Sequence, residues 1–204
     1  MHSTNKKAFF GDLVFEVCDD VYEPAEDSFL FAENLHVHKG SRVLDVGTGS
    51  GILGILAAIN AAEVIAVDLS PIAILCAKEN SKRNGVQDKI SFLRGDLFTA
   101  LWERRKFDFI LFNAPYLPSE KGEDETWIGR AWAGGASGRT VIDRFISKAP
   151  LYLKKDGRIL LLQSSLSNIE KTINSFAEFQ FRTSVLAYLD LPFFERLVLL
   201  EATN

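Results

Sequence analysis

The sequence has few of the residues that mark several protein classes. It contains two cysteines, Cys18 and Cys76, three histidines and one methionine among 204 residues. The cysteines lack the spacing of a metal site, and Cys76 falls on the apolar face of an expected helix. We therefore predict ordinary thiols, no metal site and a reducing, cytoplasmic location.

Excess basic charge and long apolar runs are also missing. Lys and Arg total 23 against 27 Asp and Glu, so the net charge is -4 and the pI is about 5.5. This balance argues against a surface built to neutralise nucleic-acid phosphates. No apolar segment is long enough to span a membrane, and polar residues interrupt the apolar residues near the amino terminus before they could form a signal core. We expect neither membrane nor nucleic acid as a partner.

The sequence does contain enough apolar residues for one well-filled core, at 47% of the chain. Residues 1–204 are expected to form one domain. Strand-like runs alternate with helical ones, which predicts an α/β fold with a doubly wound sheet. The expected strands are 42–46, 63–68, 89–94, 107–112, 158–163, 182–188 and 194–201.

The connections between these strands define the topology. A helix follows Ser70, its expected N-cap, and ends before Gly85. The link at Leu191-Pro192 is too short for a parallel crossover, so the last two strands should pair antiparallel. The prediction is a seven-stranded, mostly parallel sheet with an antiparallel last strand and helices on both faces. Further segments are expected as helices over 26–36, 138–153 and 166–179, and as a short strand over 13–17.

Three acidic residues accompany a glycine turn where strands end. Residues 43–51 read Val-Leu-Asp-Val-Gly-Thr-Gly-Ser-Gly and run from a strand into a helix, a typical approach site for a nucleotide. Asp68 ends the second strand, where a carboxylate can accept both hydroxyls of a ribose. Asp96 ends the third strand and could accept a hydrogen bond from the exocyclic amine of an adenine.

The pattern G-x-G-x-G, with Asp45 two positions before its first glycine, resembles the first motif of class I S-adenosylmethionine-dependent methyltransferases. The resemblance implies a Rossmann-like fold and S-adenosylmethionine as the cofactor. It implies that the glycine loop passes the methionine part, that Asp68 holds the ribose and that Asp96 meets the adenine. The implied cofactor site comprises Asp45, Gly47, Gly49, Asp68, Asp96 and Leu97, with Asn113 beside it.

A second motif follows the strand at 107–112. Asn113-Ala114-Pro115-Tyr116 resembles the (Asn/Asp)-Pro-Pro-(Tyr/Phe) motif of methyltransferases that modify a planar nitrogen. The Asn113 oxygen and a neighbouring backbone carbonyl can accept the two N–H groups of that nitrogen while Tyr116 packs on its flat face. All four residues are expected to contact substrate, and Asn113, Pro115 and Tyr116 to be catalytic. Ala114 replaces the first proline of the family, and restoring that proline is expected to keep or raise activity.

Two further stretches, 21–28 (VYEPAEDS) and 130–139 (RAWAGGASGR), resemble the release factor glutamine methyltransferases, particularly their short archaeal and eukaryotic HemK-type form. The resemblance implies that residues 1–38 form a strand and helix that close over the cofactor, with Tyr22 and Ser28 as contacts. Residues 39–204 would form the Rossmann-like core. The second stretch would be a flexible glycine loop at the substrate entrance, with Trp127 and Trp132 either there or in the core.

The expected activity is N5-methylation of the glutamine of a Gly-Gly-Gln loop in a class 1 translation termination factor. Methylation of adenine N6 in DNA or RNA is an alternative, because the nitrogen geometry is similar. A non-catalytic cofactor-binding subunit is a second alternative. The short family form typically works with a small zinc-binding activator along one sheet edge. The 16 Phe residues and a third strand, Ile90–Leu93, expected at an edge, suggest such a partner here.

Overall fold

The computed structural model describes residues 6–102 and 106–204. Its seven-stranded sheet has the order β5-β4-β3-β6-β7-β9-β8. Only β9 runs antiparallel to its neighbours, β7 and β8, so the predicted mostly parallel sheet with an antiparallel last strand is confirmed. The strands of this sheet are β3 (Arg42–Val46), β4 (Glu63–Asp68), β5 (Ile90–Arg94), β6 (Phe107–Asn113), β7 (Leu153–Ser164), β8 (Arg182–Asp190) and β9 (Arg196–Thr203).

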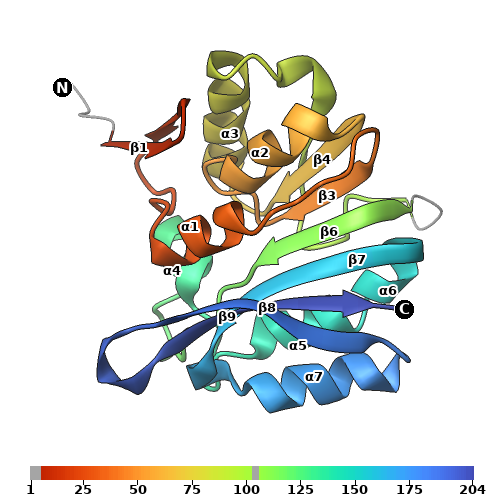
Figure 1. The fold of residues 1–204 in the computed structure, drawn as a ribbon. Coiled ribbons are helices and arrows are strands. Elements are labelled where there is room, and N and C mark those ends of the chain that lie inside the picture. The colour runs from red at the N-terminus through yellow and green to blue at the C-terminus, as the bar shows by residue number, and fades with distance from the viewer. Residues whose placement is uncertain (1–5, 103–105) are drawn as a thin grey trace.

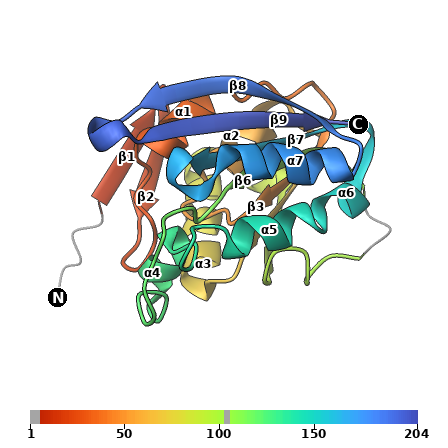
Figure 2. The ribbon, with the colours of Figure 1, turned by 90° about the horizontal axis from the view of Figure 1, so that it is seen from below.

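Helices cover both faces of this sheet (Figure 1, Figure 2). One face packs against α1 (Glu26–Glu33) and α2 (Ile52–Asn60), with α3 (Pro71–Arg83) beside α2. The other packs against α5 (Thr140–Ile146), α6 (Ala149–Tyr152) and α7 (Ile169–Glu178). The remaining helix, α4 (Trp127–Trp132), lies in the connection after β6, and single 3-10 turns occupy Gln87–Lys89, Ser165–Ser167 and Pro192–Phe194.

The central strands are buried on both faces because successive side chains point to opposite sides of a strand. In β6, Phe109 and Leu111 enter the core on the α1–α2 face. Ile110 and Phe112 enter the core on the α5–α7 face. This double burial explains why the sequence shows continuous apolar runs rather than alternation.

Several predicted boundaries were wrong. The helix expected over 138–153 is two helices, α5 and α6, with Pro150 in the first turn of the second, where its missing N–H costs no hydrogen bond. The helix expected over 26–36 ends at Glu33, and the helix expected over 166–179 begins at Ile169. Strand β7 begins earlier than predicted, and α4 was not predicted.

The short amino-terminal strand is part of a hairpin. Strand β1 (Lys6–Phe10) was not predicted, and it pairs antiparallel with β2 (Leu13–Val17). Asparagine side chains of α3 hold β2: Asn80 exchanges hydrogen bonds with both backbone groups of Glu16, and Asn84 does so with Val14. Asn80 Nδ2 also donates to the carbonyl of Ser50, 2.9 Å away. The hairpin is therefore tied to the glycine loop. No helix among the described residues is both long and apolar enough to cross a bilayer.

Candidate active site

A cavity of about 1020 Å³ opens at the carboxyl ends of the parallel strands. This is the edge at which open α/β sheets bind ligands. Its walls come from the glycine loop, the ends of β4, β5 and β6, the segment before α1, and the region around α4. Of the predicted site residues, those that line it are Tyr22, Ser28, Gly47, Gly49, Asp68, Asp96, Leu97, Asn113, Ala114, Pro115 and Tyr116. Asp45 is absent from this lining.

Asp45 lies behind the glycine loop, 1% exposed. Its Oδ2 accepts hydrogen bonds from Thr48 Oγ1 at 2.6 Å and from the Gly54 amide at 3.0 Å. Burial raises the pKa of this carboxyl to about 6, partly offset by those two bonds. Asp45 therefore fixes the turn into α2 rather than facing the cavity, which corrects the expectation that it contacts the cofactor directly.

Asp68 reaches the cavity from the end of β4. Its Oδ2 accepts the Gly49 amide at 2.9 Å and its Oδ1 accepts the Ser70 amide at 2.8 Å. Burial raises the pKa of this carboxyl above its usual value, and the backbone donors work against that shift. Each carboxylate oxygen retains acceptor capacity beyond one bond, so the group can still bind a diol.

Asp96 and Leu97 follow β5 at the far end of the cavity. Leu97 has a left-handed backbone with φ of 51°. Arg144 of α5 places its Nη2 2.6 Å from Asp96 Oδ2. Arg144 also lines the cavity, and the sequence analysis missed it. Its position on a helix 48 residues away leaves no local sequence signal.

Asn113 ends β6 with its side-chain amide in a fixed orientation. Its Nδ2 donates to Asp27 Oδ2 at 2.9 Å, and Ser28 Oγ lies 3.5 Å from the same nitrogen. Its Oδ1 is buried and has no hydrogen-bond partner among the described residues. A buried acceptor without a partner is costly, so this oxygen is a candidate binding group for a ligand N–H.

Asp27 connects this amide to the segment before α1. It is 5% exposed, and its Oδ1 accepts the Ser28 amide at 2.6 Å and the Tyr22 hydroxyl at 3.3 Å. The sequence analysis did not single out Asp27, which falls within the stretch 21–28. Its position beside Tyr22 and Ser28 in the 21–28 motif was the one available signal for its role.

The two tyrosines of the site remain neutral. Burial raises the pKa of Tyr22 and of Tyr116 above the ordinary tyrosine value, and the negative charge of Asp27 adds to both shifts. Neither phenol is poised to act as a base near neutral pH. Tyr116 can instead contribute a flat, partly apolar surface to the cavity.

The residues after Asn113 are held by backbone hydrogen bonds. The Ala114 amide donates to the Leu162 carbonyl at 3.2 Å, a bond that proline could not make. We therefore revise the expectation for Ala114→Pro: the substitution removes a hydrogen bond from the site.

A second glycine-rich loop, residues 134–138, packs directly on residues 116–119. The Gly134 amide donates to the Leu117 carbonyl at 2.8 Å, and the Ser119 amide donates to the Gly135 carbonyl at 3.0 Å. A Cβ at Gly138 would lie 2.2 Å from the Tyr116 carbonyl oxygen, which explains the glycine. These contacts hold residues 134–138 against the Tyr116–Ser119 segment, and the expectation of a flexible loop stays a prediction.

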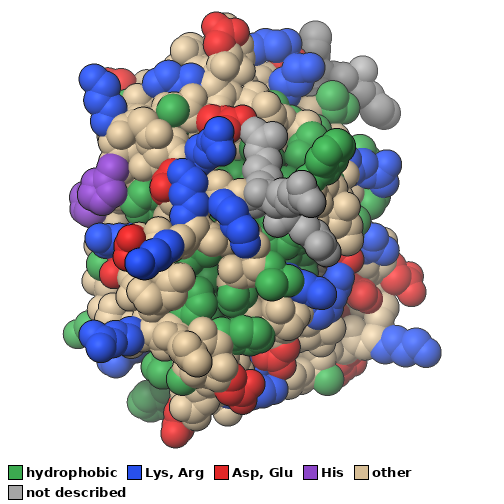
Figure 3. Space-filling model, turned by 90° about the vertical axis from the view of Figure 1, so that its right-hand side faces the viewer, with side chains coloured by type: hydrophobic (Ala, Val, Ile, Leu, Met, Phe, Trp, Pro, Cys, Tyr) green, Lys and Arg blue, Asp and Glu red, His purple; other side chains and the backbone are tan. Residues whose placement is uncertain are grey.

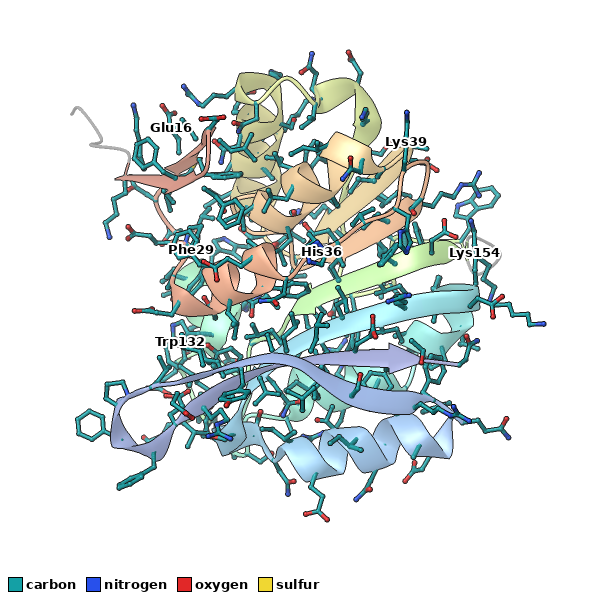
Figure 4. All side chains as sticks on the ribbon, in the orientation of Figure 1. Glu16, Phe29, His36, Lys39, Trp132 and Lys154 are labelled. Atoms are coloured by element: carbon teal, nitrogen blue, oxygen red, sulfur yellow. The ribbon has the colours of Figure 1, made fainter. Side chains whose placement is uncertain are left out.

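Aromatic side chains line part of the main cavity. Trp127 and Trp132 line the cavity rather than the core, and the Arg130 guanidinium lies 5.1 Å from the centre of the Trp127 ring. Phe29 of α1 and Trp132 of α4 lie on the same side of the molecule (Figure 4). Together with Ile128 they line a second cavity of about 590 Å³ beside the first.

Asp68 lines the main cavity together with the glycine loop and the Asp96–Leu97 turn, and Val46 and Phe112 provide apolar wall. A carboxylate acceptor beside an apolar wall is suited to a nucleoside. Among the described residues, no group of three His, Cys, Asp or Glu side chains is placed to hold a metal ion.

Comparison with known proteins agrees with this geometry. The family model of ribosomal protein L11 methyltransferase (PrmA) matches residues 27–114. A protein of Methanocaldococcus jannaschii named as a candidate protein N5-glutamine methyltransferase is 43% identical over 88% of this chain and 90% of its own length. Human methyltransferase HEMK2 is 34% identical over 81% of each chain.

A solved structure of Mtq2 from E. cuniculi, in a complex with Trm112 that methylates the eRF1 termination factor, superposes with a TM-score of 0.72 at 22% identity. The match covers 91% of this chain and 99% of that one. The chain belongs to the HemK-type family of protein N5-glutamine methyltransferases. It is a class I enzyme that depends on S-adenosylmethionine.

Proposed function

We propose that this enzyme methylates N5 of the glutamine in a Gly-Gly-Gln loop of a class 1 translation termination factor. The observation that carries the proposal is the buried Asn113 Oδ1, which has no partner among the described residues and whose amide orientation is fixed by Asp27. A glutamine side-chain N–H is the donor that such an acceptor fits. The names of the relatives, protein N5-glutamine methyltransferase and release factor glutamine methyltransferase, support the same substrate.

Asp68 would hold the ribose of the cofactor, the Asp96–Leu97 turn its adenine, and the loop of Gly47 and Gly49 its methionine part. When bound, S-adenosylmethionine supplies an electrophilic methyl group. Tyr22, before α1, and Ser28, in its first turn, would cover this site from one side. The chain needs no metal for these roles, because carboxylate and backbone groups supply the contacts.

The amide nitrogen of glutamine is a weak nucleophile because its lone pair is delocalised. Asn113 Oδ1 accepts one N–H and so orients the nitrogen, while Pro115 fixes the local backbone and Tyr116 packs on the flat amide. The proton on nitrogen becomes acidic only as the methyl group is transferred, so Asn113 has only to accept a hydrogen bond from this N–H, and the proton can leave to water after the transfer. Alignment is the main contribution of these residues.

Adenine N6 is the competing substrate. Against it stands the net charge of -4. Figure 3 shows the face at the amino ends of the parallel strands, away from the cavity, where Lys and Arg lie among acidic, apolar and neutral side chains. Extracting a base also requires phosphate contacts and unstacking energy. The names of the relatives favour protein glutamine.

We further propose that a small zinc-binding activator pairs with β5. This strand is at an edge of the sheet, as predicted, and the neighbouring helices expose Leu75 (64%) and Ile59 (51%). The Trm112 partner of the structurally similar Mtq2 supports this assignment. Residues 1–204 would act as one methyltransferase domain in the cytoplasm.

The test is to offer labelled S-adenosylmethionine with an intact archaeal-type termination factor, its Gln→Ala variant, and adenine-containing DNA and RNA. Mass spectrometry then locates the label. Label on the loop glutamine, absent from the variant, is the expected result. Label on adenine with none on the factor would replace the proposal with the nucleic-acid alternative.

A further inference from the structure

The hairpin that joins β8 to β9 ends in two aromatic rings that contact little of the protein. The side chains of Phe193 and Phe194 are essentially fully exposed. Both have left-handed backbones, with φ of 61° and 64°. This region is unfavourable for bulky side chains, so the turn accepts a conformational cost while burying neither ring. Because this strained backbone brings neither ring into packing contact within the chain, it indicates that the rings serve a contact outside the hairpin.

Several contacts hold the base of the hairpin together. Asp190 and Arg196 face each other across the strands with their side chains 2.5 Å apart. The Arg196 guanidinium lies 4.5 Å from the centre of the Tyr188 ring, and its backbone amide donates to Ser165 Oγ at 3.0 Å. The turn itself closes through a bond of 2.8 Å from the Leu191 amide to the Glu195 carbonyl. The two rings are therefore presented on a fixed support.

This support stands next to the active site. Ala187 and Leu191 of the hairpin pack on the same core cluster as Tyr116. The hairpin tip extends past the carboxyl ends of the parallel strands, on the side where α1 and α4 lie (Figure 1, Figure 2). The charge of Glu195, next to Phe194, contributes to the raised pKa of Tyr116. A protein whose loop enters the cavity would meet this tip.

We propose that Phe193 and Phe194 are the docking element for the body of the substrate protein and insert into an apolar surface beside its glutamine loop. The inference rests on the proposed function. A Gly-Gly-Gln tip has little side-chain surface, so affinity has to come from remote contacts of this kind. Membrane lipid is a poorer occupant, because Asp190 and Glu195 flank the turn and residues 191–195 contain no Lys or Arg.

The proposed docking site leaves the activator site free. Strand β8 forms the edge of the sheet opposite β5. A partner on β5 and a substrate at the hairpin tip can therefore bind at the same time. The two surfaces are separable by mutation.

The test uses the double variant Phe193→Asn/Phe194→Asn, because asparagine tolerates the left-handed backbone and should leave the melting temperature unchanged or raise it. With the intact termination factor as substrate, we expect KM to rise at least about tenfold. We expect kcat at saturation, S-adenosylhomocysteine affinity and the slow methylation of a free Gly-Gly-Gln peptide to remain unchanged. Trp102→Asn is the control, since Trp102 is 84% exposed and precedes the amino end of β6, away from the cavity. It should leave KM unchanged.

The outcomes separate the two proposals. If the wild-type enzyme does not methylate the factor, the proposed function fails. If it does and the double variant keeps the wild-type KM, the docking role fails and the function stands. If the wild type is a dimer by light scattering and the double variant a monomer, the rings bind a second copy of the chain and the docking role is again overturned.

Discussion

The contact between Asp27 and Asn113 predicts that Asp27→Asn, which replaces one oxygen by a nitrogen, turns over the side-chain amide of Asn113. In Asp27→Asn, the new amide has to keep its oxygen toward the Ser28 amide, which lies 2.6 Å from Asp27 Oδ1. Its nitrogen then takes the place of Oδ2, 2.9 Å from Asn113 Nδ2. Two donors cannot share a hydrogen bond, so Asn113 must turn over. Its NH2 group, rather than its oxygen, would then face the glutamine N–H.

The size of the effect follows from the kind of interaction lost. Removing one aligned hydrogen-bonding group from a reacting centre costs roughly 10²–10³ in kcat, or about 2.7–4 kcal/mol. We expect Asp27→Asn to lower kcat by about a hundredfold, measured under saturating S-adenosylmethionine and termination factor. Affinity for S-adenosylhomocysteine, measured by calorimetry, should change less than kcat does. Tyr22→Phe is the control, because it removes only the 3.3 Å bond to Asp27 Oδ1 and leaves Asn113 in place.

The exchange variant Asp27→Asn/Asn113→Asp provides the sharper assay. The amide nitrogen introduced at position 27 can donate to one oxygen of the carboxylate introduced at position 113, and the other oxygen again faces the substrate. Activity of the exchange variant should exceed that of Asp27→Asn by at least about tenfold, the signature of two directly coupled side chains. It should also exceed Asn113→Asp, in which two carboxylates meet. An exchange variant no more active than Asp27→Asn would refute the orientation argument.

Four further outcomes are expected. Asp68→Ala should weaken S-adenosylhomocysteine binding about tenfold or more, by calorimetry, because a charged acceptor contributes roughly 1.5–3 kcal/mol; unchanged affinity would remove Asp68 from the site. Asn113→Ala should lower kcat about a hundredfold while that affinity stays within a few fold, and equal losses would contradict a role toward substrate. Ala114→Pro should lower the melting temperature, since it deletes the bond to the Leu162 carbonyl; an unchanged or higher value would show that bond to be dispensable. The folded pKa of Asp45 is raised to about 6, so protonated Asp45 stabilises the fold at low pH, and this stabilisation is lost as pH rises through about 6. The unfolding free energy of Asp45→Asn minus that of the wild type should therefore increase by about 1–3 kcal/mol between about pH 4 and pH 7, by denaturant titration; a pH-independent difference would contradict the raised pKa.

Local chemistry made much of this fold predictable. The glycine turn after β3, the acids after β4 and β5 and the Asn113–Tyr116 motif are each continuous in sequence, and the strands before them are unbroken apolar runs. Parallel strands bring their carboxyl ends to one edge, so these residues had to meet. The elements that the sequence analysis missed depend on distant partners. Strand β1 forms because β2 offers it a partner, and α4 sits in a connection with no apolar periodicity.

The missed site residues have the same cause. Asp27 and Asn113 are separated by 86 positions, and Arg144 and Asp96 by 48. Neither pair leaves a periodic trace, because the contact depends on where α1 and α5 dock on the sheet. The direction of Asn113 is set by such a contact. The motif therefore predicts Asn113 as a site residue, whereas only the packed structure supplies the reason for its orientation.

Residues 22–28, which run into the first turn of α1, join the two parts of the proposed site. Tyr22 and Ser28 line the main cavity, and Asp27 between them orients the amide of Asn113. The same segment follows the amino-terminal hairpin, which Asn80 ties to the carbonyl of Ser50 in the glycine loop. A displacement of residues 22–28 would therefore disturb both the lining of the main cavity and the hydrogen bond that orients the Asn113 amide.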